Sequence, residues 1–478
     1  MVPENLWKDP PARRISFTEW GELFLQVPDE LLVDYYHYFR RDQEKRGGPA
    51  RWSAYLFPPQ QFAVYGCRHL KRLKYDNSLA ALRLWGFVQN ETERLFRARQ
   101  LGRKVVACLG DLGAVPVIVN SFPGVTAFYP DCLWWTPFVM ESKVLFEAAA
   151  ELGIGEATCY SRAALGAFAK HAYFPDPDLC IASSGASCDD YAAVEQLAAA
   201  FARDIIWAEE PVRPASIADK PDPKSVAFLA QEYRRIVKQL EELTGHHLSE
   251  EELHHGIQKA NRIRRLTAHL RELAYGQGLL PALEMMIVEF GCLHHYSDID
   301  EWTEILVHLA ETAERRKENG ESVTAADALR IVWVTPPADP LFLCYFEDAG
   351  CRIVGTEYVI NQALEIIAED NPPLEAIAES FLAASLIGTT RQRSESVIAQ
   401  ARRHQADGVV ISGIFGGSHC AMETRLISHY VREALGLPVL EFDVPDPAPE
   451  ISQQLRTRIE AFLEVLAERR SQICLAGR

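Results

Sequence analysis

Short apolar runs alternate with amphipathic helical segments from about residue 103 to the end of the chain. Runs at 104–108, 116–119, 179–183 and 204–207 predict strands, and 138–152 and 191–202 predict helices between them. A second block predicts strands at 331–335, 352–355, 408–412 and 439–442, and a terminal amphipathic helix at 450–469. Continuously apolar strands that alternate with helices are typical of parallel, doubly wound sheets, so the sequence predicts two α/β lobes.

Helical patterns fill the rest of the chain. Residues 225–319 follow a proline-rich segment and predict several helices, with breaks at Gly245 and Gly276. We therefore expect a mainly helical extension at 1–100, a first α/β lobe at 101–215, a helical linker at 216–325, and a second lobe with a C-terminal helix at 326–478. Ligands of such sheets bind beyond the carboxyl ends of the strands, and here also between the lobes.

Charge and hydropathy exclude some classes of function. The 478 residues contain 49 Lys and Arg against 66 Asp and Glu, a net charge of −17. A general nucleic-acid or anionic-membrane binder needs a basic surface, so neither partner is expected. The most apolar long stretch, 105–140, is interrupted by Asp111 and Asp131, which argues against a membrane span. The N-terminus has no apolar signal-peptide core, so we expect a cytoplasmic protein.

The cysteines carry the candidate chemistry, because no P-loop, GxGxxG, HExxH, GxSxG or CxxC motif is present. Cys188 and Cys420 each follow a predicted strand and open a helix, and Cys159 opens another. Helix N-termini lower thiol pKa values, and thiolates select iron–sulfur clusters or zinc. Most cysteines are small buried hydrophobes instead, and we expect that of four that lie in or beside strands: Cys108, Cys180, Cys344 and Cys351.

Two further features lie near the same predicted strand ends. His419 precedes Cys420, where it could orient or protonate a substrate, or cap the helix. Glu209 and Glu210 follow the strand at 204–207, and surface exposure is the favoured interpretation for both.

Several stretches together resemble the 2-hydroxyacyl-CoA dehydratase / benzoyl-CoA reductase family, in its large, D-component-type subunits. The resemblance covers roughly residues 100–470. Thr158 stands where the family usually places the cysteine that here is Cys159. The segments are 102–106 (GRKVV), 158–166 (TCYSRAALG), 177–190 (PDLCIASSGASCDD), 243–249 (LTGHHLS), 330–335 (RIVWVT), 406–410 (ADGVV), 436–443 (GLPVLEFD) and 456–462 (RTRIEAF).

The resemblance implies Rossmann-like lobes around a [4Fe-4S] cluster held by three cysteines, here Cys159, Cys188 and Cys420. It implies an oxygen-sensitive, cytoplasmic enzyme that removes water from a 2-hydroxyacyl-CoA by a radical route, started by one-electron reduction. It also implies two partners, a homologous second subunit and an ATP-hydrolysing iron–sulfur activator. His419 would be the substrate contact.

Three alternatives stay open. The chain could be a subunit of an ATP-dependent aryl-CoA (benzoyl-CoA) reductase, since the same electron injection reduces an aromatic thioester. It could be a non-catalytic or electron-transfer scaffold subunit of such a complex. The same cysteines could instead hold a colourless, redox-silent zinc ion.

Overall fold

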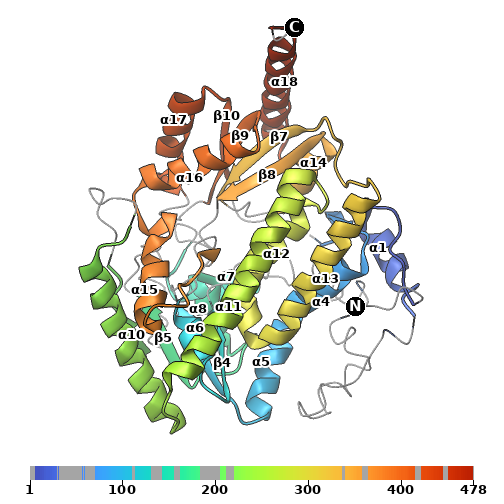
Figure 1. Ribbon diagram of the computed structural model, residues 1–478. Helices are drawn as coiled ribbons and strands as arrows, with labels where there is room; N and C mark the ends of the chain where they lie inside the picture. The colour runs from blue at the N-terminus through green and yellow to red at the C-terminus, as the bar shows by residue number, and fades with distance from the viewer. Residues whose placement is uncertain are drawn as a thin grey trace.

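The computed structural model describes residues 6–28, 31, 56, 59, 70–109, 114–130, 143–155, 162–183, 205–211, 220–335, 340–357, 364–414, 421–444 and 451–476. It contains two four-stranded parallel sheets at two levels of the molecule, with long helices beside them (Figure 1). The predicted fold class, α/β with two doubly wound lobes joined by helices, is confirmed.

The first sheet has the order β4 (Val125–Phe128), β3 (Lys104–Leu109), β5 (Leu179–Ser183), β6 (Ile205–Ala208), and every pair is parallel. Successive residues of β3 belong to different apolar clusters: Val105 and Ala107 to one, Val106 and Cys108 to the other. Both faces of the strand are therefore buried, which explains why its sequence is apolar without alternation. The chain runs from β3 to β4 on one side and later to β5 on the other, so the strand order reverses between β3 and β5.

The strand predicted at 116–119 is wrong. Val115–Val119 forms the short helix α6, and the second strand of the sheet is β4 instead. Pro116 lies in the first turn of α6, where a missing N–H breaks no hydrogen bond. All five residues of α6 are buried. A short helix that is apolar all round cannot be told from a buried strand by periodicity.

The second sheet repeats the topology of the first. Its order is β10 (Val439–Val444), β9 (Gly408–Ile414), β7 (Leu329–Val334), β8 (Cys351–Glu357), again all parallel. In both sheets the first strand along the chain lies between the second and the third, and the fourth follows the third. The predicted strands are confirmed here to within two residues at each end.

Helices pack around both sheets, and their bounds agree in part with the predicted ones. The helix predicted at 138–152 is α7, and the terminal helix is α18, which projects at the top of Figure 1 and begins and ends later than predicted. The helix predicted at 191–202 lies outside the described residues. The helices of the lobes are α7 (Lys143–Glu151), α8 (Arg162–Lys170), α14 (Leu341–Asp348), α15 (Pro373–Ala383), α16 (Thr390–Arg403), α17 (Thr424–Leu435) and α18 (Gln453–Ala476).

The helical segment between the sheets consists of α10 (Pro223–Thr244), α11 (Glu250–Arg271), α12 (Ala282–His294) and α13 (Ile299–Glu318). The predicted break at Gly245 is confirmed: this residue ends α10 with a φ of 71°, a conformation that favours glycine. Ser249 and Glu252 then form a capping box that starts α11. A π-helical turn at Glu272–Gly276 precedes the second break. No helix in the described part of the chain is long and apolar enough to cross a membrane.

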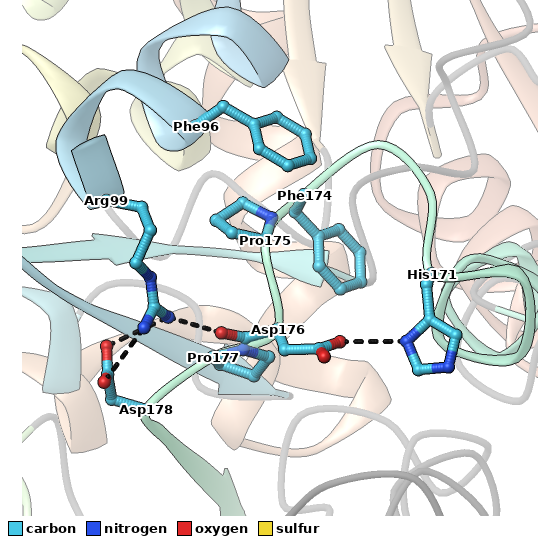
Figure 2. A pocket seen from close by; sticks show the side chains of 8 residues that line it. All are labelled: Phe96, Arg99, His171, Phe174, Pro175, Asp176, Pro177 and Asp178. Atoms are coloured by element: carbon cyan, nitrogen blue, oxygen red, sulfur yellow. Dashed lines mark hydrogen bonds and ion pairs between the residues drawn. The ribbon is translucent and has the colours of Figure 1, made fainter.

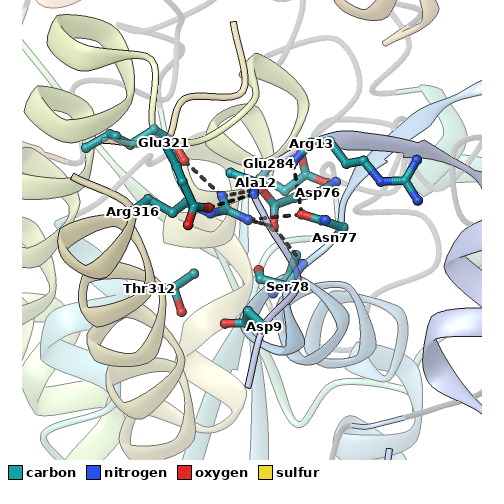
Figure 3. A network of polar contacts seen from close by, with 12 residues as sticks. Asp9, Ala12, Arg13, Asp76, Asn77, Ser78, Glu284, Thr312, Arg316 and Glu321 are labelled. Carbon is teal, nitrogen blue, oxygen red and sulfur yellow. Dashed lines mark hydrogen bonds and ion pairs between the residues drawn. The ribbon is translucent and has the colours of Figure 1, made fainter. Parts of the chain in front are cut away.

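The N-terminal part of the chain is anchored to this helical segment. It includes α1 (Phe17–Phe24), α4 (Leu79–Gln89), α5 (Glu91–Gln100), and a two-stranded antiparallel pair, β1 (Arg14–Ser16) and β2 (Lys74–Asp76), that the sequence did not indicate. At the end of β2, the Asp76 carboxylate accepts hydrogen bonds of 2.6 and 3.0 Å from Arg316 of α13 (Figure 3). The Glu284 Oε1 atom of α12 accepts from the backbone N–H of Asp76 at 3.0 Å and from Trp85 at 3.2 Å. This buried cluster fixes β2 on the helices.

Candidate functional site

The four predicted site residues, Cys159, Cys188, His419 and Cys420, lie outside the described residues, so their side chains stay predictions. The structure does describe the elements next to them. Strand β5 ends at Ser183, five residues before Cys188, and β9 ends at Ile414, six residues before Cys420. Helix α8 begins at Arg162, three residues after Cys159.

Strands β5 and β9 occupy equivalent places in the two sheets. Each is the third strand of its lobe along the chain, and each pairs with the first strand at the point where the strand order reverses. Ligands of open parallel sheets bind at this point, beyond the carboxyl ends of the strands. The chain segments that contain Cys188 and Cys420 therefore leave the two lobes at corresponding switch points.

The cysteines that we predicted to be core residues are confirmed as such. Cys108, Cys180, Cys344 and Cys351 are buried and unbridged. Burial raises the pKa of the Cys180, Cys344 and Cys351 thiols to about 12, so they stay protonated near neutral pH. Among the described residues, no group of three or more His, Cys, Asp or Glu side chains is placed to hold a metal ion.

Buried polar groups mark the switch point of the second lobe. The Trp333 indole N–H donates to Ser412 Oγ at 2.9 Å, and that hydroxyl donates to the Thr335 carbonyl oxygen at 2.9 Å. Thr335 directly follows β7 and has a φ of 64°, which is rare for a β-branched residue. Its strained backbone is tied to β9 by Ser412, so the ends of the two strands at the switch point are held together.

A buried ion-pair cluster lies beside this edge. Arg393 of α16 is 1% exposed and donates to both carboxylate oxygens of Glu357, at 2.9 and 2.7 Å, at the very end of β8. Its Nη1 atom donates to Glu423 Oε2 at 2.7 Å. Glu423 is the N-cap residue of α17, and its other oxygen accepts from the Thr390 hydroxyl at 3.0 Å. One arginine thus joins the end of β8, the start of α16 and the start of α17.

The charge of this cluster matches its position in the fold. Arg393 carries one positive charge, whereas Glu357 and Glu423 together carry two negative ones when ionised. A cation in the first turns of a helix is unfavourable unless carboxylates offset it. Here the excess negative charge lies at the N-termini of both α16 and α17, where the helix dipoles stabilise it.

The opposite face of β8 contains a second buried carboxylate. Glu289 of α12 is fully buried and forms an ion pair with Arg271. It also accepts hydrogen bonds from the Tyr275 hydroxyl at 2.7 Å and the Thr356 hydroxyl at 2.8 Å. Burial raises the pKa of Glu289, and the Arg271 guanidinium opposes that rise. Thr356 and Glu357 are neighbours on the strand, so ionic groups flank the end of β8 on both faces.

Gln400 covers the open edge of β8. Its amide accepts from the Thr356 N–H and donates to the Thr356 carbonyl oxygen, both at 3.1 Å. Gly355 makes room for it, because a Cβ atom there would lie 2.7 Å from the Gln400 Oε1 atom. This side chain takes the place of a neighbouring strand and protects the sheet edge.

The sequence analysis did not identify the buried polar residues at the end of β8. It also placed one buried carboxylate of the first lobe, Glu210, on the surface. The predicted strand at 352–355 stopped before Glu357, and nothing in the local sequence links this residue to Arg393 or Glu423, 36 and 66 positions away. Glu210, expected on the surface, is buried just beyond β6, whereas Glu209 is exposed as expected. The usable signal was the position of these carboxylates directly after predicted strands.

The surface also has a hollow of about 600 Å³, at the opposite edge of the first sheet (Figure 2). Asp178 directly precedes β5 and accepts a hydrogen bond from the N–H of Val105 in β3 at 2.8 Å, which places the hollow at the amino ends of the strands. Arg99 forms an ion pair of 3.0 Å with Asp178, and His171 one of 3.1 Å with Asp176. The charged side chains of this hollow are paired with one another, and ligands of parallel sheets bind at the carboxyl ends of the strands. We therefore place the candidate site at the carboxyl ends and not in this hollow.

Comparisons with known proteins identify the family of this chain. The sequence matches the model of the 2-hydroxyglutaryl-CoA dehydratase D-component family over residues 135–466. A putative dehydratase subunit of Escherichia coli K12, YjiM, is 28% identical over 257 residues, which are 51% of this chain and 65% of that protein. The β subunit of (R)-phenyllactyl-CoA dehydratase from Clostridium sporogenes is 23% identical over 251 residues, 50% of this chain and 63% of that subunit. Each match thus covers slightly less than two thirds of the relative.

Proposed function

Because the chain belongs to the 2-hydroxyglutaryl-CoA dehydratase D-component family, we propose that it is the iron–sulfur subunit of a 2-hydroxyacyl-CoA dehydratase. Its substrate is an acyl-CoA thioester from which water is eliminated by a radical route. It works with a homologous second subunit and with an ATP-hydrolysing iron–sulfur activator that delivers the electron. The protein acts in the cytoplasm under anaerobic conditions.

One observation supports this proposal most directly. The segments with Cys188 and Cys420 follow equivalent strands, β5 and β9, at the switch points of two lobes with the same topology. Thiolates are the usual ligands of iron–sulfur clusters, and three of them would leave one iron of a [4Fe-4S] cluster without a protein ligand. Cys159, Cys188 and Cys420 all fall within the matched range 135–466. By contrast, Cys180, Cys344 and Cys351 are buried core residues with raised thiol pKa values, which makes them unsuitable as thiolate ligands.

In this proposal Cys159, Cys188 and Cys420 hold a [4Fe-4S] cluster with one iron open to the substrate oxygen. The cluster supplies a one-electron relay and a Lewis-acid position. The described residues of the chain hold the strand ends in place: Ser412 and Thr335 join β9 to β7. His419 contacts the substrate beside Cys420.

Anaerobic reconstitution of the purified chain tests the proposal. The wild type is expected to bind about four irons with equal acid-labile sulfide and to show a reducible EPR signal. Cys188→Ala and Cys420→Ala are expected to lose most of this iron. Cys180→Ala is the matched control, because Cys180 lies on β5, the strand that precedes Cys188, and is buried with a raised thiol pKa. It is expected to keep the cluster.

The other assignments give different results in the same experiment. If the wild type binds zinc in place of iron, and the same two variants lose it, the cluster assignment is wrong and the cysteine metal site is supported. If the wild type binds no metal, the scaffold-subunit assignment is favoured. If the cluster is present, assays with the second subunit and activator distinguish dehydration of a 2-hydroxyacyl-CoA from reduction of an aryl-CoA.

A further inference from the structure

The two N-terminal strands form a clasp over the start of helix α12 (Figure 3). The clasp consists of β1 and β2, residues 14–16 and 74–76, which pair antiparallel with Arg14 opposite Asp76. The backbone N–H of Asp76 donates a hydrogen bond to the Oε1 atom of Glu284, in the first turn of α12, at 3.0 Å. Glu284 is fully buried. The contact between the clasp and the helix therefore runs through a carboxyl group that water does not reach.

A second buried carboxyl group joins the clasp to the same helix end. Glu347 of α14 accepts a hydrogen bond of 2.9 Å from the N–H of Ala282, the first residue of α12. Its other oxygen lies 3.5 Å from the Nη1 atom of Arg14, and Arg14 also donates to Asp348 at 2.7 Å. The clasp thus holds the start of α12 from two sides, and each contact includes a glutamate.

Carboxyl groups outnumber cations where these elements meet. Four carboxyl groups face three cations, so one of them lacks a positive partner if all four are ionised. Glu284 is that group: its Oε1 atom accepts from two uncharged donors, the Asp76 N–H and the Trp85 indole, and its buried Oε2 atom has no hydrogen-bond partner among the described residues. The seven charged groups are Arg14 of β1, Lys74 and Asp76 of β2, Glu284 of α12, Arg316 of α13, and Glu347 and Asp348 of α14.

A proton on Glu284 removes this excess of negative charge. Burial, together with the Asp76 carboxylate, raises the pKa of Glu284 to about 8, and burial raises the pKa of Glu347 to about 7. The other neighbours do not take up this proton, because burial keeps the Cys344 thiol protonated and Arg271 of α11 pairs with Glu289.

Opening of the clasp exposes both glutamates to water, where the pKa of each returns toward the ordinary value of 4.5. The closed clasp therefore binds protons that the open clasp releases between pH 4.5 and about 8. Linkage then requires that opening becomes more favourable as the pH rises through this range.

We infer that β1 and β2 form a pH-sensitive clasp, which is closed on α12 while Glu284 is protonated and loosens when Glu284 ionises beside Asp76. Loosening also affects α1, because Trp20 of α1 stacks on Tyr75 of β2 with ring centroids 4.1 Å apart. The inference is independent of the proposed iron–sulfur function, since it involves only the N-terminal strands and the helices that they contact.

Hydrogen–deuterium exchange of the full-length chain tests the inference. Exchange is followed by mass spectrometry from pH 6 to pH 9 and corrected for the intrinsic effect of pH on amide exchange, and it reports local opening. In the wild type, the opening equilibrium of peptides that contain β1 and β2 should rise about tenfold between pH 7 and pH 8, and should level off above pH 8.

Two amide variants show whether Glu284 is responsible. Glu284→Gln keeps an oxygen that accepts from Asp76 and Trp85 but cannot ionise, so the rise between pH 7 and pH 8 should shrink to about twofold, from Glu347 alone. Glu289→Gln is the matched control, because Glu289 is a fully buried carboxylate of the same helix that contacts Arg271 and β8 instead of the clasp. It should keep the tenfold rise. If a variant does not fold, as judged by circular dichroism, the wild-type pH profile decides.

Three results would overturn the inference. The first is corrected wild-type exchange in β1 and β2 that does not change with pH. The second is exchange of these strands only through global unfolding, which urea denaturation at each pH identifies. The third is a full tenfold rise in Glu284→Gln, or its loss in Glu289→Gln as well. Iron content does not enter these measurements, so failure of the proposed function leaves the clasp untouched.

Discussion

Two buried arginines, Arg316 and Arg393, each lie near two carboxylates, but their surroundings differ. Arg393 contacts both of its partners, Glu357 and Glu423, directly. Arg316 forms its ion pair with Asp76, whereas Glu284 interacts with the backbone of Asp76 and with Trp85 instead (Figure 3). Burial, together with the nearby Asp76 carboxylate, raises the pKa of Glu284 to about 8.

The two clusters differ in whether both carboxylates contact the arginine directly. Loss of hydration disfavours the ionised form of a buried carboxylate, and direct hydrogen bonds to a cation oppose that effect. Glu357 and Glu423 both accept hydrogen bonds from Arg393. Glu284 lacks them and holds a proton near neutral pH. One cluster is therefore a set of ion pairs, and the other is an ion pair beside a neutral acid.

Removal of each arginine is expected to have the largest effect. Arg393→Met leaves the buried Glu357 and the partly exposed Glu423 without their cation and should lower the free energy of unfolding by about 3–5 kcal/mol. Arg316→Met leaves only the Asp76 carboxylate without its cation, because Glu284 is already protonated. The loss in free energy of unfolding should therefore be smaller for Arg316→Met than for Arg393→Met. Urea denaturation followed by circular dichroism compares the two. An equal or larger loss in Arg316→Met would contradict the distinction.

Replacement of the acids by amides should have opposite consequences. Glu284→Gln keeps the oxygen that accepts from Asp76 and Trp85, and removes the need to bind a proton. The raised pKa means that the folded wild type binds this proton between pH 4.5 and about 8 while the unfolded chain releases it, so wild-type stability falls across this range. The gain in free energy of unfolding of Glu284→Gln over the wild type should be near zero at pH 4.5. It should grow by up to about 1.4 kcal/mol per pH unit and level off above pH 8.

Glu357→Gln is the comparison variant for this experiment. It removes a direct partner of Arg393, so it should destabilise the protein at neutral pH rather than stabilise it. Thermal unfolding of both variants and the wild type from pH 5 to pH 9 measures the contrast. A Glu284→Gln variant less stable than the wild type at pH 9 would show that Glu284 is ionised in the fold.

An exposed pair on the same helix as Arg393 should have the smallest effect. Arg391 and Glu395 of α16 lie 3.4 Å apart, with side chains 73% and 63% exposed. Water screens such pairs, so Glu395→Ala should change the free energy of unfolding by less than about 0.5 kcal/mol. Denaturation in the same buffer as for Arg393→Met checks this, and a change above 1 kcal/mol would mean that burial is not what separates the two pairs.

Sequence reasoning reached most of the fold because the strands are buried on both faces. The run at 179–183 is apolar up to its final Ser183, and the strand found there has the same ends. It failed at 116–119, where a buried helix of five residues has the composition of a strand. The antiparallel pair β1 and β2 was also missed, because its strands are three residues long and 57 residues apart.

The cysteine site stays a prediction that the strand topology supports. Its ligands could be chosen because each lies next to the end of a strand or the start of a helix, a local property of the sequence. The buried charged residues at the edge of the second sheet could not be identified from such local properties of the sequence. Glu357 and Glu423 meet Arg393 only because three elements converge at one edge of the second sheet.

The sequence by itself determined where most of the strands and helices form, because apolar periodicity and capping residues act over a few positions. It also determined the family of the chain, because the motifs keep their order and spacing. The tertiary structure alone decided which charged side chains are buried together, and thus that Glu284 is neutral while Arg393 holds two carboxylates. Burial and pairing depend on contacts between residues far apart in the chain, and these contacts exist only after the lobes have folded.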